Sequence, residues 1–155
     1  MANSTRLNGV IKALDEGTTA FTTFSPADPE SASALSGTNY DGVVFEMEHG
    51  PFNTVALRDA LQYLLSRGQI LNGGTLAPAV TPMVRIPPNG GEMNQWIAKQ
   101  VLDLGVYGII FPHISTVEEA WNAVRACRYP SMPEKEDYDP PGIRGDAPVR
   151  AARYW

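Results

Sequence analysis

The most restrictive feature of this 155-residue sequence is a repeated switch between two hydrophobic periodicities. Short β-branched and aromatic segments predict strands, whereas segments with an apolar residue at every third or fourth position predict helices. The predicted strands cover residues 19–24, 42–46, 79–86 and 106–111. A helical pattern follows each strand, at residues 29–35, 53–65, 93–104 and 116–124. This alternation predicts an α/β fold with four βα units and a parallel sheet.

Periodicity and composition also predict the structure of the segments around these units. Residues 7–14 carry a further helical pattern. Residues 68–77 are rich in Gly and Asn, and residues 129–146 are rich in Pro, Asp and Glu, so we expect both segments to be loops. A doubly wound sheet and a (β/α)₈ barrel both begin with such units, and the periodicity alone does not separate them.

The composition is that of an ordinary soluble protein, with 43% hydrophobic and 19% charged residues. A net charge of −5 disfavours nucleic acid and anionic lipid as partners. No apolar run approaches the ~20 residues that a membrane span needs, and no apolar segment typical of a signal peptide follows the first residues. The one cysteine, Cys127, lies in a helical pattern, where a small core residue is the favoured interpretation. We therefore expect a single cytoplasmic domain over residues 1–155.

Polar residues follow three successive predicted strands at their carboxyl ends. His49 comes shortly after the strand at 42–46, Arg85 ends the next apolar strand, and His113 follows the fourth. Ligands of parallel α/β folds bind at this end of the sheet, because the loops there vary while the strands hold them rigidly. The three strand ends together therefore predict a site.

Each of these residues has a functional and a structural interpretation. Beside Glu46 or Glu48, His49 could act as a general base near neutral pH, or it could be a surface histidine among surface acids. His113 leaves the same two possibilities open. Arg85 needs a partner for its charge, which is either a structural ion pair with Glu46 or Glu48 or a substrate carboxylate held by its planar guanidinium.

Three other patterns carry less information. Glu46, Glu48 and His49 could bind a cation, but the sequence has no spaced metal motif. Adjacent residues on a strand point to opposite faces, so we expect the side chains of Glu48 and His49 not to converge. Arg144 lies between glycines, where capping a loop is favoured over contact with an anion.

Four segments taken together resemble the HpcH/HpaI aldolase family. They are Glu46-Met47-Glu48-His49-Gly50-Pro51, Val84-Arg85-Ile86-Pro87, residues 102–112, and residues 128–130 with 141–145. The resemblance implies a (β/α)₈ barrel, of which this chain covers about the first four βα units. It also implies a divalent metal such as Mg²⁺, Mn²⁺ or Co²⁺, and cleavage of a hydroxy-2-oxo acid to pyruvate and an aldehyde.

The resemblance also assigns roles to individual residues. His49 matches the family's base-associated histidine, and Glu46 stands where the family usually has an aspartate one methylene shorter. Arg85 matches the arginine that binds the 2-oxo acid and stabilises the enolate. Glu48 is a further candidate for binding the substrate. His113 matches a histidine of the branch that resembles macrophomate synthase, which implies oxaloacetate decarboxylation.

The family's two metal carboxylates are expected on later strands, beyond Trp155, so no metal ligand is assigned in this chain. An unpaired sheet edge predicts a homo-oligomer. Two rival interpretations follow: a catalytically inactive half-barrel with a structural or oligomerising role, and a citrate-lyase-type enzyme acting on a coenzyme A thioester. The Glu48-His49-Gly50 motif favours the aldolase over the thioester enzyme.

Overall fold

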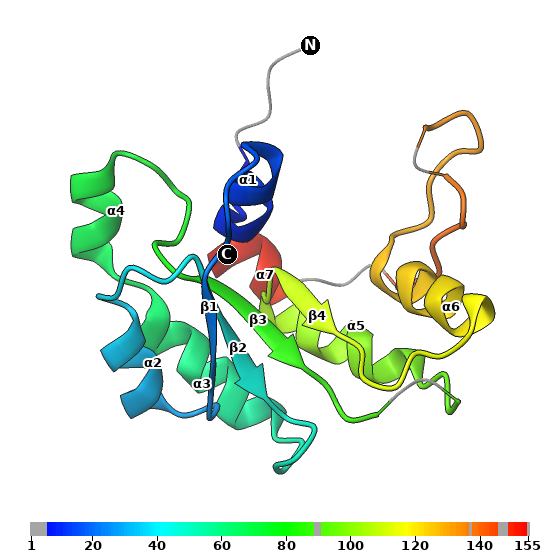
Figure 1. The fold of residues 1–155 in the computed structure, drawn as a ribbon, viewed down its shortest axis with the longest axis horizontal. Helices are drawn as coiled ribbons and strands as arrows, with labels where there is room; N and C mark the ends of the chain where they lie inside the picture. Colours follow the sequence, from blue (N-terminus) through cyan, green and yellow to red (C-terminus); the bar gives the residue numbers. More distant parts are fainter. Residues whose placement is uncertain (1–5, 89–90, 137, 146–148, 155) are drawn as a thin grey trace.

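A computed structural model describes residues 6–88, 91–136, 138–145 and 149–154 (Figure 1). Its centre is a four-stranded sheet in the order β1-β2-β3-β4. All three strand pairs are parallel, so the arrowheads in Figure 1 point to the same side. The strands are β1 (Thr22–Ser25), β2 (Gly42–Glu46), β3 (Thr81–Arg85) and β4 (Gly108–Ile110). The expected parallel sheet of βα units is therefore confirmed.

The described helices precede, separate and follow these strands. They are α1 (Gly9–Asp15), α2 (Pro29–Leu35), α3 (Thr54–Leu64), α4 (Arg67–Gly73), α5 (Gln95–Leu104), α6 (Val117–Cys127) and α7 (Val149–Tyr154). Local capping explains where several of them begin and end. Asn53 accepts hydrogen bonds from the first backbone N–H groups of α3, and Thr116 forms a reciprocal capping box with Glu119 at the start of α6. Gly105 closes α5 in the left-handed conformation, at φ 114°.

The expected loop at 68–77 is wrong in its first half, which forms most of α4. The hydroxyl of Ser66 caps the start of this helix by accepting from the backbone N–H of Gln69, and Gly74 ends it at φ 61°. The predicted strands at 79–86 and 106–111 are also longer than the observed ones. A strand extends only over residues that pair with a neighbouring strand. Since five residues of β3 pair with β2, β3 is limited to Thr81–Arg85.

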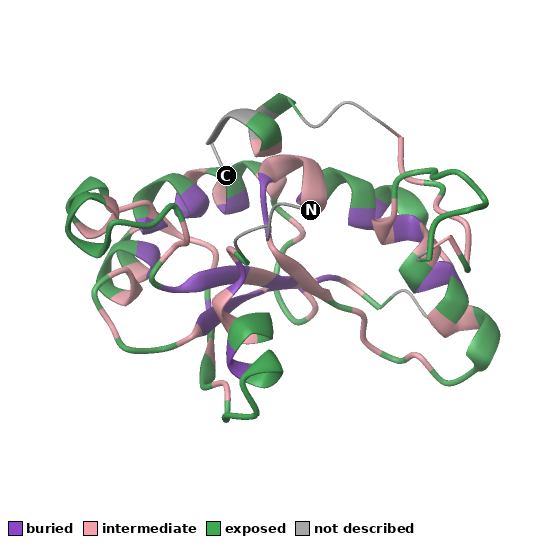
Figure 2. Cartoon of the chain, turned by 90° about the horizontal axis from the view of Figure 1, so that it is seen from above, coloured by how far each residue is buried: buried purple, intermediate pink, exposed green. Residues whose placement is uncertain are grey.

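The hydrophobic core lies between the sheet and the helices that cover one of its faces. In Figure 2 the buried residues follow the strands and the inward sides of the helices. The core includes Val43 and Phe45 of β2, Leu57 and Leu61 of α3, and Val84 of β3, all of them fully buried. Burial of such a cluster is the main stabilising contribution to the fold.

Strand register places four other side chains on the opposite face of the sheet. Phe24 pairs with Val44, Glu46 pairs with Arg85, and Arg85 pairs with Ile110. Side chains alternate between faces along a strand, so Phe24, Glu46, Arg85 and Ile110 all project away from the helix-covered core. The alternation that buries Phe45 and Val84 therefore presents Glu46 and Arg85 near the carboxyl ends of the strands.

Candidate functional site

Arg85 is the centre of the candidate site, and its side chain is 24% exposed. Its Nη2 donates a hydrogen bond to Glu46 Oε2, which joins the last residues of β3 and β2 across the sheet. Its Nε lies 3.0 Å from Glu48 Oε2, without the alignment that a hydrogen bond requires. One guanidinium therefore lies against two carboxylates, and its single positive charge balances only one of them.

Glu48 joins all three strand ends. Its side chain is only 6% exposed, although it follows the strand and carries a charge. Besides Arg85, it contacts His113, whose Nε2 lies 3.2 Å from Oε1, and His49, whose Nε2 lies 3.6 Å from Oε2. A carboxylate this deeply placed needs such partners, because burying an unpaired charge is prohibitive.

The expectation that Glu48 and His49 diverge is therefore wrong. Strand β2 ends at Glu46, and residues 48–50 form a bend rather than strand. The alternation of side chains between two faces no longer applies there. The carboxylate of Glu46 stabilises this bend, because Oε1 accepts the backbone N–H groups of Glu48 at 2.7 Å and His49 at 3.2 Å.

These contacts determine the charge of the cluster. Burial by itself would raise the pKa of Glu46, but the hydrogen bond from Arg85 and those from two backbone N–H groups outweigh it. The pKa of Glu46 consequently lies below its usual value, and its carboxylate is ionised at neutral pH. The same hydrogen bond raises the pKa of Arg85. Both side chains therefore remain charged.

Phe24 is a site residue that the sequence reasoning missed. The guanidinium carbon of Arg85 lies 4.7 Å from the centroid of the exposed Phe24 ring. This distance is within the range of a cation–π contact, which also restrains the plane of the guanidinium. The available signal was an aromatic residue at the carboxyl end of a predicted strand, but its use required the register between strands.

The two histidines occupy the rim of the cluster. The side chains of His49 and His113 are 72% and 70% exposed, so both imidazoles reach solvent. His113 adopts a positive φ of 61°, an uncommon conformation that directs the chain back toward Glu48. The imidazole of His49 lies nearest to the carboxylate of Glu48, whereas Glu46 contacts His49 through the backbone N–H.

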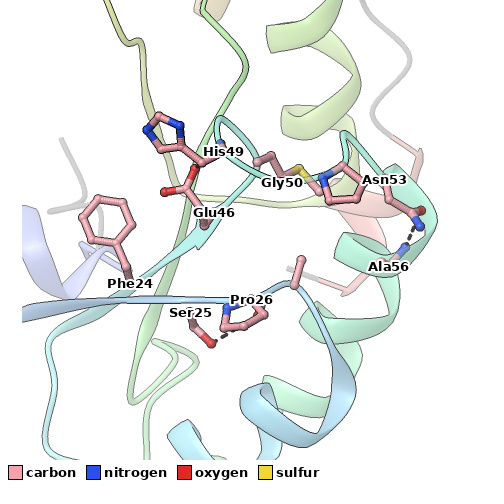
Figure 3. A pocket seen from close by; sticks show the side chains of 11 residues that line it. Phe24, Ser25, Pro26, Glu46, His49, Gly50, Asn53 and Ala56 are labelled. Atoms are coloured by element: carbon pink, nitrogen blue, oxygen red, sulfur yellow. Dashed lines mark hydrogen bonds between the residues drawn. The ribbon is translucent and has the colours of Figure 1, made fainter.

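A cavity of about 490 Å³ adjoins this cluster (Figure 3). The connections that follow β1 and β2 form its walls, together with Ala56 of α3. Glu46 and His49 belong both to the cavity wall and to the charged cluster. A molecule in the cavity would therefore contact the cluster at one end.

The described residues do not fit a divalent metal. No group of three or more His, Cys, Asp or Glu residues within this part of the chain could hold such an ion. The physical reason lies in Arg85, because both nearby carboxylates already face its guanidinium. Mg²⁺ and Mn²⁺ prefer several oxygen ligands that converge on one point.

Arg144 and Cys127 lie outside this cluster. Arg144 forms an ion pair with Asp103 at 2.8 Å and lies 4.5 Å over the ring of Tyr129, so it anchors the loop, as the favoured interpretation expected. Burial raises the pKa of the Cys127 thiol to about 11. A thiol with so high a pKa is largely protonated and unreactive at neutral pH.

Comparison with known proteins identifies the family. Residues 21–140 match the model of the HpcH/HpaI aldolase/citrate lyase family. The chain belongs to this family. It is 36% identical over 125 residues to a hydroxypyruvate/pyruvate aldolase of Roseobacter denitrificans, covering 80% of this chain and 43% of that protein. It is also 32% identical to a 4-hydroxy-2-oxovalerate aldolase of Rhodococcus jostii, over 96% of this chain and 49% of that one.

Solved structures agree on the fold. An HpcH/HpaI aldolase from Desulfitobacterium hafniense superposes with a TM-score of 0.67 at 20% identity, covering 94% of this chain and 48% of the other. Macrophomate synthase superposes with a TM-score of 0.61 at 24% identity, covering 93% and 42%. These likenesses show the fold alone, and they confirm a partial (β/α)₈ barrel. The chain thus spans about half the length of the relatives that it matches.

The comparisons also bear on the remaining expectations. They confirm the resemblance drawn from the four sequence segments. In the part of the chain that the structure describes, no helix combines the length and the apolar character needed to cross a membrane.

Proposed function

We propose that this chain forms the 2-oxo acid-binding part of an aldolase that cleaves hydroxy-2-oxo acids to pyruvate and an aldehyde. The observation that carries the proposal is the position of Arg85 at the carboxyl ends of the strands, between Glu46, Glu48 and Phe24. The names of the relatives, a hydroxypyruvate/pyruvate aldolase and a 4-hydroxy-2-oxovalerate aldolase, support the same reaction class.

Arg85 is suited to hold the acid. Its contacts with Glu46 and Glu48 use Nη2 and Nε, and among the described residues no partner takes the N–H groups of Nη1. A guanidinium binds a carboxylate or an enolate oxygen through such donors. The two glutamates and Phe24 fix its plane, so the donors are oriented before the ligand arrives, which favours the charge that develops during reaction.

The chemistry needs a base and a stabilised enolate. In the cleavage direction a base removes the proton of the C4 hydroxyl, the bond between C3 and C4 breaks, and the C4 oxygen becomes the aldehyde carbonyl. The electron pair of the broken bond forms the pyruvate enolate, which then takes a proton at C3. His49, exposed and 3.6 Å from Glu48, is placed to accept the hydroxyl proton directly or through water.

Oxaloacetate decarboxylation is a second candidate. It gives the same enolate by loss of CO₂, and the contact of His113 with Glu48 supports it, because the carboxylate of Glu48 also faces Arg85. The inactive half-barrel is not favoured, since the charged cluster is assembled and the named relatives are aldolases. A divalent metal would need ligands other than the described residues, so no step here depends on one.

We also propose that the protein works as a cytoplasmic homo-oligomer on a small-molecule substrate. Exposed apolar residues at spacings of four and three positions on α6 support self-association: Val117, Trp121 and Val124. In the described sheet, β1 and β4 are the edge strands, and the backbone groups of an edge strand can pair with a second chain.

The test of the activity is pyruvate release from a 4-hydroxy-2-oxo acid, followed with a coupled lactate dehydrogenase assay. Arg85→Lys keeps the charge but loses the planar donor set, so we expect kcat/KM to fall by roughly two orders of magnitude. Arg6→Lys is the matched control, because Arg6 is an exposed residue that pairs with Asp15. Equal activity of the wild type and the Arg85→Lys variant would assign Arg85 a structural role.

A further inference from the structure

The cavity beside the charged cluster has walls that are mostly apolar. Pro26 and Ala27 follow β1, Met47 and Pro51 follow β2, and Ala56 extends from α3. In Figure 3, Glu46 and His49 extend from the end of β2 at one side of the cavity. A volume of about 490 Å³ is within the range of small-molecule sites, which runs from ~300 to ~1,000 Å³.

The side-chain oxygens that line these walls already have partners within the protein. The side-chain oxygen of Asn53 accepts the backbone N–H groups of Val55 and Ala56. The hydroxyl of Ser25 donates to the carbonyl oxygen of Pro26 at 3.1 Å. Glu46 uses both carboxylate oxygens on Arg85 and on the 48–50 bend. The walls therefore favour a ligand that is itself mostly apolar.

The charge of the cavity disfavours an anion. Among the described lining residues there is no lysine or arginine, and Glu46 is the one carboxylate. The pKa of Glu46 is lowered, so this carboxylate is ionised at neutral pH. Arg85, the cation beside Glu46, also faces Glu48, so its single charge does not compensate a further carboxylate, which the cavity would repel.

We propose that this cavity is the subsite for the aldehyde, and that it selects an uncharged aliphatic aldehyde over one that carries a carboxylate. The proposal rests on the proposed function, because the 2-oxo acid then occupies Arg85 and leaves the cavity to the second reactant. Glu46 and His49 border both regions, so the carbonyl carbon of the aldehyde faces the enolate and the base, while its alkyl chain extends toward Pro51 and Ala56.

The test separates binding from turnover. Butyramide and butyrate have the same length and differ in charge, and neither reacts with the protein. Titrated into ¹⁵N-labelled protein, butyramide should shift the backbone amides of Met47, Gly50 and Ala56 and bind at least roughly fivefold more tightly than butyrate. Equal affinity, tighter binding of butyrate, or shifts that avoid these amides would overturn the proposal.

Two variants test the role of charge by adding an arginine either inside the cavity or away from it. Ala56→Arg introduces a guanidinium at the wall, and it should raise the affinity for butyrate and remove the preference for butyramide. Ala34→Arg makes the same change at an exposed position of α2 that does not line this cavity, and should leave the preference unchanged. An Ala56→Arg variant with unaltered affinity for butyrate would count against the role of charge.

The turnover arm compares butanal with succinic semialdehyde as partners of pyruvate. Faster product formation with butanal supports the assignment of the cavity to the aldehyde, and faster formation with succinic semialdehyde overturns it. If the amide shifts appear as expected but neither aldehyde is turned over, the proposed function is contradicted, and so is the assignment of the ligand as an aldehyde. The preference of the cavity for an uncharged molecule would still hold.

Discussion

Replacing Arg85 with methionine should destabilise the protein through the two carboxylates that it leaves behind. Glu46 and Glu48 both lie against this guanidinium, and their side chains are 21% and 6% exposed. Removing one partner of a fully buried ion pair costs about 3–5 kcal/mol, whereas an exposed pair contributes about 0–1 kcal/mol. Glu46 and Glu48 are neither fully buried nor fully exposed. We therefore expect a value between these two energies, a loss of about 2 kcal/mol in the free energy of unfolding at pH 7.

The stability lost in Arg85→Met should become smaller as the pH falls. The folded-state pKa of Glu46 is below its usual value, so this group stabilises the fold above the unfolded pKa of about 4.3. That contribution decreases as the pH falls through the lower, folded pKa. The Arg85→Met variant lacks the hydrogen bond that lowers the pKa, so the difference in stability between wild type and variant should narrow below about pH 4.

Urea unfolding, followed by circular dichroism at several pH values, measures the loss of stability and its dependence on pH. In thermal unfolding at pH 7, the melting temperature of the variant should be about 4–8 °C lower for a chain of this size. Arg85→Met combined with Glu48→Gln should recover part of the loss, because it removes one unpaired charge. Arg6→Met is the control, since Arg6 and Asp15 are both more than half exposed. If the free energy of unfolding of Arg85→Met lies within about 0.5 kcal/mol of the wild-type value, the two carboxylates do not depend on Arg85 for their stability.

Two other outcomes are expected. Mn²⁺ titrated calorimetrically into the 155-residue chain should bind weakly, with a Kd above about 100 μM, because the carboxylates of Glu46 and Glu48 already face Arg85. Micromolar binding would show that these carboxylates are available to a metal. Asn53→Ala should lower the free energy of unfolding by about 1 kcal/mol, measured by urea unfolding, because it removes the acceptor that caps α3; Asn53→Asp should retain most of the stability, and equal losses in both variants would argue against capping.

The sequence predicts the order of strands and helices because hydrophobic periodicity follows burial directly. The strand ends are less predictable, since they depend on which residues find a pairing partner on a neighbouring strand. Helix α4 was missed because its glycines and asparagine favoured a loop, although Ser66 and Gly74 carry the signals of a helix start and end. Helix α7 falls in a segment for which the periodicity gave no prediction.

The site shows the same division. That Arg85, His49 and His113 meet follows from their places at parallel strand ends. That Glu48 joins all three does not follow, because it requires the bend after β2. Phe24 enters the site through the register of β1 with β2, a relation between distant segments that local patterns do not contain.

Whether Arg85 holds a 2-oxo acid is tested by calorimetric titration of pyruvate into the wild type and the Arg85→Lys variant. We expect the wild type to bind pyruvate and the variant to bind it at least roughly tenfold more weakly, because a lysine ammonium lacks the oriented Nη1 donors of the guanidinium. The Arg6→Lys control should bind as the wild type does. Pyruvate binding of equal affinity in the wild type and Arg85→Lys, or no binding to the wild type, would show that Arg85 does not hold the acid.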